Sequence, residues 1–136
     1  MTTHPFLSDE WFEAVQRIKW NAAGNPVGAA GLVVNATITD VPFGSRTVEL
    51  HSSHGPMVGW TPGHADDPVI AMTVDYHTAR SLILDDSPDM RVLDQAGTSG
   101  ALSIDGDAGA LRAWFATRRA NPEAVAIEDS VRAITR

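Results

Sequence analysis

The strongest constraint on the fold is a pair of neighbouring segments in which apolar and polar residues alternate. Residues 32–39 place an apolar side chain at every second position, and residues 46–52 repeat this two-residue period. Such a period puts the apolar side chains on one face of a β-strand that is buried on that face only. The intervening segment 41–44 has proline second and glycine fourth, which is typical of a type I turn. The pair therefore predicts a hairpin in a half-buried sheet.

Three further segments have the character of strands. We expect a short strand over residues 57–60, after a turn at 53–56, and another over residues 101–104. Residues 69–74 are apolar on both faces, which predicts a central strand. These segments complete a five-stranded sheet.

Helical spacing of apolar residues marks five more segments. The expected helix starts each carry a capping or first-turn residue, namely Ser8, Asp75, Ser87-Pro88, Asp107 and Asn121-Pro122. We expect the first helix to end near Gly24 and Asn25-Pro26, and the third to end at Gly97. The resulting order, α-β-β-β-β-α-α-β-α-α, predicts one α+β domain spanning residues 1–136. Its sheet would be a single layer, largely antiparallel and covered by about five helices.

The charge pattern excludes several classes of partner. The net charge is −7, and the ten cations are nine arginines and Lys19, scattered without a basic cluster. Nucleic acids and anionic membrane surfaces are therefore poor partners, and stable membrane anchoring is not expected. The chain has no cysteine, no leader pattern and no long apolar run, so we expect it in the cytosol.

Motifs for catalysis and for metal binding are weak. Dinucleotide-binding, P-loop and HExxH patterns are absent, so no cofactor is expected. His51 and His54 could surround a metal together with His64 or Asp66, but no ligand spacing on a rigid element favours this, and we predict no metal site. We interpret the acidic pairs Asp66-Asp67 and Asp85-Asp86 as surface charge that favours solubility.

Large apolar side chains are plentiful for so small a domain. The sequence holds four tryptophans, four phenylalanines and four methionines. A packed core accounts for most of them, yet a sheet covered by helices also leaves room for an apolar cavity between the two layers.

Several motifs, taken in succession, resemble the sterol-carrier-protein-2 family. They are the segments 34–44, 47–50, 60–63, 67–82 and 99–107, and the match as a whole covers roughly residues 8–118 in the family's order. The resemblance implies a five-stranded sheet and helices enclosing an apolar tunnel for sterols, fatty acids or acyl-CoA esters. It implies neither a cofactor nor catalytic residues.

The resemblance also suggests which residues line that tunnel. They come from the strand 69–74, the helix after it, the strand 101–104 and the helix after that: Met72, Val74, Leu82, Ile83, Leu102, Ile104, Trp114 and Phe115. Trp114 and Phe115 would form a lid or wall. The resemblance is to a family whose eukaryotic members are basic and end in a peroxisomal tripeptide. This chain, in contrast, is acidic and ends Ile134-Thr135-Arg136. The scarcity of lysine suits a high-GC bacterial genome, so we expect a bacterial member.

Three hypotheses about function follow. The first is a carrier that buries an apolar small molecule. The second is an isomerase- or hydrolase-like enzyme on the same fold, with Asp75, His77 or His51 as a buried base. The third is a partner-binding domain with an exposed apolar patch, which would form a homodimer or a heteromeric interface. The carrier is the preferred prediction, and catalysis is not expected.

Overall fold

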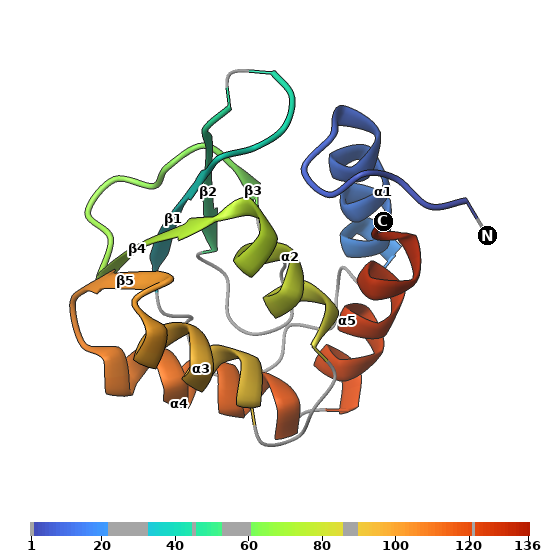
Figure 1. Ribbon diagram of the computed structural model, residues 1–136. Helices are drawn as coiled ribbons and strands as arrows, with labels where there is room; N and C mark the ends of the chain where they lie inside the picture. Colours follow the sequence, from blue (N-terminus) through green and yellow to red (C-terminus); the bar gives the residue numbers. More distant parts are fainter. Residues whose placement is uncertain (1, 22–32, 45, 53–60, 86–89, 121) are drawn as a thin grey trace.

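The computed structural model describes residues 2–21, 33–44, 46–52, 61–85, 90–120 and 122–136 (Figure 1). In these residues five strands form one sheet in the order β3-β2-β1-β4-β5. The strands are β1 (Val34–Thr39), β2 (Val48–Ser52), β3 (Thr61–Pro62), β4 (Ile70–Asp75) and β5 (Leu102–Asp105). Because β3 has only two residues, the other four strands make up almost all of the sheet.

The sheet is mixed. β1 pairs antiparallel with β2 and parallel with β4, and the pairs β2–β3 and β4–β5 are antiparallel. The predicted hairpin is therefore confirmed, and three of the four strand pairs run antiparallel as expected. The strand predicted over residues 57–60 and the turn over 53–56 lie outside the described residues.

Burial alternates along β4 and β5, so that one face of these strands is covered and the other is more exposed. In β4, Ile70, Met72 and Val74 are buried, whereas Thr73 is exposed. The expectation that residues 69–74 are buried on both faces is wrong, and Val69 is 59% exposed. β4 does lie in the interior of the sheet, between β1 and β5, but β1 is the middle strand. The strands on either side bond to the backbone N–H and C=O groups of β4, and this does not require its second face to be buried.

Five helices account for the rest of the described fold. They are α1 (Asp9–Asn21), α2 (Tyr76–Leu84), α3 (Arg91–Ser99), α4 (Ala108–Ala120) and α5 (Pro122–Ile134). α2 packs against β1 and β4, α3 packs against β5, and α5 contacts α1, α2 and α4. Figure 1 shows α3 and α4 below the sheet and α1 with α5 beside it. The predicted α+β class and element order are confirmed.

The helix starts follow the expected capping residues. Ser8 Oγ accepts a hydrogen bond from Trp11 N (3.2 Å), Asp75 caps α2 through Thr78 N (3.2 Å), and Asp107 Oδ1 accepts from Ala110 N (3.1 Å). These side chains satisfy backbone N–H groups that have no partner within the helix.

The end of α3 differs from the prediction. The helix does not end at Gly97 but continues to Ser99, and Gly100 ends it with a φ of 81°. This left-handed conformation is the usual one for a glycine that follows a helix. α3 begins at Arg91, and Ser87-Pro88 lies outside the described residues, as do Asn121 and the predicted end of the first helix at 24–26.

The two ends of the chain lie side by side, which the sequence pattern did not predict. His4 N donates to Ile134 O (2.7 Å), and Arg136 N donates to His4 O (2.9 Å). Trp11 Nε1 donates to Thr135 Oγ1 (2.9 Å), and Tyr76 Oη donates to the Phe6 carbonyl (3.1 Å). We call residues 4–7, together with Trp11 and the hydrogen bonds just described, the N-terminal clamp. It places Phe6 beside Tyr76, the first residue of α2.

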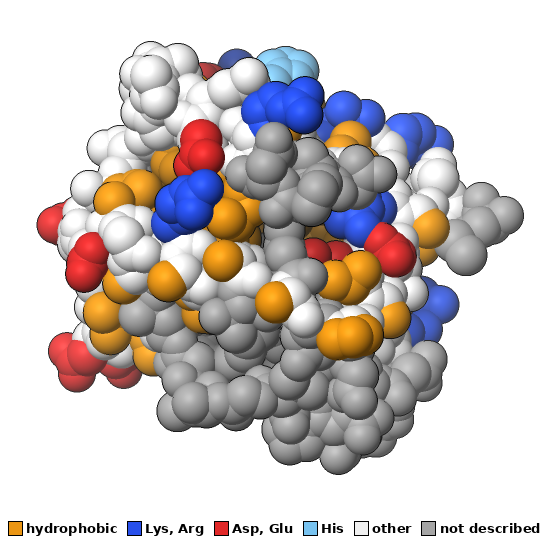
Figure 2. Space-filling model, turned by 90° about the horizontal axis from the view of Figure 1, so that it is seen from below, with side chains coloured by type: hydrophobic (Ala, Val, Ile, Leu, Met, Phe, Trp, Pro, Cys, Tyr) orange, Lys and Arg blue, Asp and Glu red, His pale blue; other side chains and the backbone are white. Residues whose placement is uncertain are grey.

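Hydrophobic side chains also reach the surface. Figure 2 shows them from below, beside basic and acidic side chains near the centre of the view. Phe43 and Val69 are the large hydrophobic residues that are exposed in the described part of the chain. No helix formed by the described residues is both long enough and apolar enough to cross a membrane.

Candidate functional site

An apolar pocket lies between the covered face of the sheet and the helices. It encloses about 80 Å³. On the same measure a single water molecule needs ~10–15 Å³, so the space exceeds an ordinary packing gap. A space of this kind, with few polar groups around it, is the usual form of a small-molecule site.

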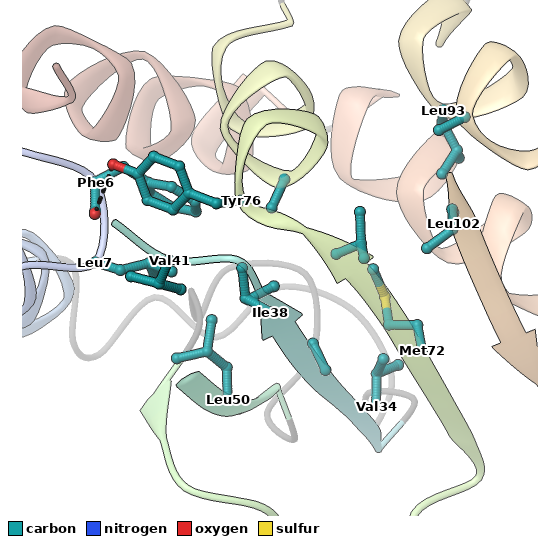
Figure 3. Close-up of a cluster of buried hydrophobic side chains, with 14 of the residues drawn as sticks. Phe6, Leu7, Val34, Ile38, Val41, Leu50, Met72, Tyr76, Leu93 and Leu102 are labelled. Atoms are coloured by element: carbon teal, nitrogen blue, oxygen red, sulfur yellow. Dashed lines mark hydrogen bonds between the residues drawn. The ribbon is translucent and has the colours of Figure 1, made fainter. Parts of the chain in front are cut away.

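The floor of the pocket comes from β1, β2 and β4. Its side chains are Ala36, Ile38, Leu50, Met72 and Val74. Ala36 stands opposite Leu50 on one side and opposite Met72 on the other, and Ile38 stands opposite Val74. Figure 3 shows Ile38, Leu50 and Met72, which come from three different strands. The two-residue period of the strands brings these side chains to one face. The middle strand thus contributes a small side chain, Ala36, between the two longer side chains of Leu50 and Met72.

The walls come from the helices and from the N-terminal clamp. α2 presents Ala79, Leu82 and Ile83, a spacing of three and four residues that lies on one helix face. α5 presents Ile127 and Val131, again four residues apart. The remaining apolar walls are Phe6, Trp11, Val15 and Phe115.

Charged groups line the pocket at one place, between the end of α2 and α5. Asp85 follows α2 directly, and Glu128 and Arg132 lie one turn apart on α5. Arg132 Nη1 donates to the Asp85 carbonyl (3.4 Å), and Arg132 Nη2 forms an ion pair with Asp129. The Arg132 side chain is only 18% exposed. We call Asp85, Glu128 and Arg132 the charged rim.

Five of the eight residues predicted to line the tunnel lie at the pocket. Met72 and Val74 belong to its floor, and Leu82, Ile83 and Phe115 belong to its walls. Each of them was recognisable in the sequence as an apolar position on a predicted strand or on a predicted helix that follows a strand.

The other three predicted residues do not line it. Leu102 and Ile104 lie on β5, which is an edge strand, and Leu102 is buried near Leu93 of α3 (Figure 3). Trp114 is buried too, but successive residues of a helix point about 100° apart, so Phe115 faces the pocket and Trp114 does not. Its ring meets that of Phe115 edge to face at 4.9 Å.

Sequence reasoning missed the contributions of the chain's two ends. The helical spacing of Trp11 and Val15 and of Ile127 and Val131 was visible in the sequence. What it lacked was any sign that α5 and the N-terminal clamp close over the same space, because that depends on their tertiary packing.

The candidate bases of the enzyme hypothesis lie away from the pocket. Asp75, His77 and His51 are not among its lining residues. Asp75 accepts hydrogen bonds from Thr78 Oγ1 (2.5 Å) and Thr78 N, which lower its pKa. A general base needs a pKa raised towards neutrality, and the environment of Asp75 has the opposite effect.

The histidines around β2 anchor a loop on the open face of the sheet. His51 Nδ1 lies 2.9 Å from the Gly63 carbonyl, and His64 lies 3.2 Å from both Glu49 Oε2 and the Ala36 carbonyl. Asn35 bonds both backbone groups of Ala65, at 2.8 and 3.0 Å. Among the described residues no three side chains are arranged to hold a metal ion, and His54 lies outside them.

Comparisons by sequence give no relative. No protein-family profile matches the chain, and no curated protein matches it either.

Comparisons by structure identify the fold. The palmitated sterol-carrier-protein-2-like 2 of Aedes aegypti matches with a TM-score of 0.51 at 18% identity, covering 85% of this chain and 96% of that one. A conserved hypothetical protein of Thermus thermophilus, described as possibly a sterol carrier protein, matches with a TM-score of 0.50 at 13% identity, covering 99% and 93%. The chain therefore has a fold similar to that of sterol-carrier-protein-2-like domains.

Proposed function

We propose that this protein binds an apolar or amphiphilic small molecule in the pocket between sheet and helices, and that it acts as a carrier. The observation that supports this most directly is the lining, in which all described residues outside the charged rim are apolar. The fold shared with sterol-carrier-protein-2-like domains agrees with it, since one structural neighbour was solved in a palmitated form.

Burial supplies the binding energy in this proposal. Removing about 200 Å² of ligand surface from water contributes about 5 kcal/mol. Part of this is lost to the ordering of ligand and side chains, so affinity depends on how well the ligand fills the space. Met72, Val74, Leu82, Ile83 and Phe115 are the predicted contacts that the pocket supports.

Two measurements test the carrier. Mass spectrometry of material extracted from the natively purified protein is expected to show an apolar molecule that is bound in stoichiometric amount. Titration with N-phenylnaphthylamine, a neutral dye that fluoresces in apolar surroundings, is expected to give saturable binding.

A pair of variants ties that binding to the pocket. Ala79→Leu adds bulk to the pocket wall, whereas Ala133→Leu adds the same bulk at an exposed position on α5. We expect Ala79→Leu to weaken dye binding about tenfold or more and Ala133→Leu to leave it unchanged. Equal binding by both variants would place the dye elsewhere and contradict the proposal.

Other expectations from the sequence stay predictions. They are the identity of the ligand as a sterol, fatty acid or acyl-CoA ester, the cytosolic location, the bacterial origin, the homodimer and the single domain over residues 1–136. The enzyme hypothesis gains no support from the pocket, whose lining lacks the candidate bases.

A further inference from the structure

We propose that the charged rim makes the pocket select a ligand whose polar end donates hydrogen bonds, an alcohol or an amine, over one that ends in a carboxylate. This inference rests on the proposed function and adds the class of head group. It concerns the one part of the lining where a ligand's polar end can find polar partners among the described residues.

The balance of charge at the rim is negative. Two carboxylates, Asp85 and Glu128, line the pocket beside one guanidinium, that of Arg132. Asp129 adds a third carboxylate through its ion pair with Arg132. The four described side chains therefore carry a net charge of about −2 at neutral pH, when each is in its ordinary ionisation state.

The guanidinium is already engaged by the protein. Arg132 donates from Nη2 to Asp129 and from Nη1 to the Asp85 carbonyl, and its side chain is largely buried between α5 and the end of α2. These bonds occupy two of its five N–H donors, so a ligand carboxylate would share the guanidinium with Asp129. It would do so close to two further negative charges, which repel it most strongly where water is scarce.

A donating head group meets the opposite situation. Carboxylates accept hydrogen bonds and have several lone pairs each, so Asp85 and Glu128 need not be unpartnered to accept one more. A hydroxyl group donates one such bond without adding charge, and an ammonium group adds favourable electrostatic attraction. The alkyl part of the same ligand would lie along Leu82, Ile83 and Val131 below the rim.

The rim also revises the role of Asp85. The pair Asp85-Asp86 was interpreted from the sequence as surface charge, but Asp85 is half-buried and lines the pocket. Asp86 lies outside the described residues. The position of Asp85 directly after α2, across from α5, is what turns an ordinary helix-end carboxylate into part of a binding site.

A competition experiment tests the selection. Decanol, decylammonium and decanoate share one alkyl chain, and each is used to displace N-phenylnaphthylamine from the unmodified protein at neutral pH and low salt. We expect decanol and decylammonium to compete about tenfold more strongly than decanoate. Decanoate that competes as strongly as decanol would overturn the inference. If none of the three competes, the proposed function itself fails.

Variants that each remove one negative charge assign the effect to the rim. Glu128→Gln removes one negative charge. We expect it to lower the ratio of decylammonium affinity to decanoate affinity several-fold. Asp129→Asn removes the negative charge that pairs with Arg132 and is expected to improve decanoate binding. Glu13→Gln, an exposed substitution on α1 with the same charge change, is the matched control and should leave the ratio unaltered.

The competition among the ligands remains interpretable if a variant is less stable. The ratio of decylammonium to decanoate is measured within each protein, so a general loss of folded protein cancels. A ratio that stays the same in Glu128→Gln and Asp129→Asn would show that these side chains do not determine which head group the pocket prefers.

Discussion

Gly106 shows how closely two segments of the sheet approach each other. It follows β5 with a φ of 128°, and a Cβ at this position would stand 2.9 Å from the Val69 carbonyl oxygen and 3.2 Å from Ile70 Cγ1. Both the backbone conformation and the lack of space therefore require glycine. The start of β4 would have to move to accept any side chain here.

Substitution of two glycines is expected to have opposite effects. Gly106→Ala should lower the free energy of unfolding by about 1–3 kcal/mol because of strain and the backbone contact. Gly97→Ala, inside α3 with nothing within 4 Å of the added carbon, should raise it by about 0.5–1 kcal/mol. Urea denaturation of both variants measures the two changes. A neutral Gly106→Ala variant would contradict the close approach of β5 and β4.

At the scale of the element, α2 depends on its capping residue. Asp75 ends β4 and caps the helix, and the hydrogen bond from the Thr78 hydroxyl is the main cause of its lowered pKa. A carboxyl group with a lower pKa in the folded state stabilises the protein above its ordinary pKa. That stabilisation is lost as pH falls through the lower, folded value.

Asp75→Ala is expected to destabilise the protein by about 1 kcal/mol at neutral pH. The difference from the unmodified protein should shrink as the solution is acidified below about pH 4, where the carboxyl group becomes protonated. Asp75→Asn, which can still cap the helix but does not titrate, is the control. Urea denaturation at neutral and acidic pH measures both effects, and a difference that does not depend on pH would contradict the role of the ionised carboxylate.

Most of the elements were predictable because their signals are local. The two-residue period gave β1 and β2, and Ser8, Asp75 and Asp107 marked helix starts that the structure confirms. The errors arose where a local pattern had two possible outcomes. An apolar run such as 69–74 fits a strand buried on either one face or both, and Gly97 fits a helix interior as well as a helix end.

The pocket was predictable only in part. Met72, Val74, Leu82 and Ile83 lie on a strand and on the helix that follows it directly, so their common orientation towards the layer between them follows from short connections. Ile127, Val131 and Phe6 reach the same space through long-range packing, for which no local pattern exists. Leu102 and Ile104 have the right apolar character, but their strand lies at the edge of the sheet.

At the scale of the whole molecule, the N-terminal clamp connects the ends of the chain to the pocket. Phe6 and Trp11 line the pocket and also bond to the other end of the chain, Phe6 to Arg136 and Trp11 to Thr135, while His4 bonds to Ile134. Tyr76 donates its hydroxyl hydrogen to the Phe6 carbonyl, and burial raises the pKa of this hydroxyl. Stability and ligand retention are therefore expected to depend on the same contacts.

Thr135→Val tests this dependence. The variant removes the acceptor of Trp11 Nε1 and leaves that buried N–H without it, so we expect a loss of about 1–3 kcal/mol in unfolding free energy. We also expect N-phenylnaphthylamine to dissociate faster, as followed by stopped-flow fluorescence. Thr135→Ser keeps the hydroxyl group and should retain both properties. If the dye dissociates from Thr135→Val as slowly as from the unmodified protein, the clamp does not control ligand retention.

The parallel pairing of β1 with β4 has a consequence for the order of folding. β1 and β2 are close in sequence and can pair early, whereas β1 meets β4 only after the chain between residues 39 and 70 has been looped out, which costs conformational entropy. Ala36 lies between Leu50, on the strand that can pair early, and Met72, on the strand that pairs later. A ligand therefore meets the complete floor of the pocket only after β4 has paired with β1, and it can stabilise only chains that have reached this stage.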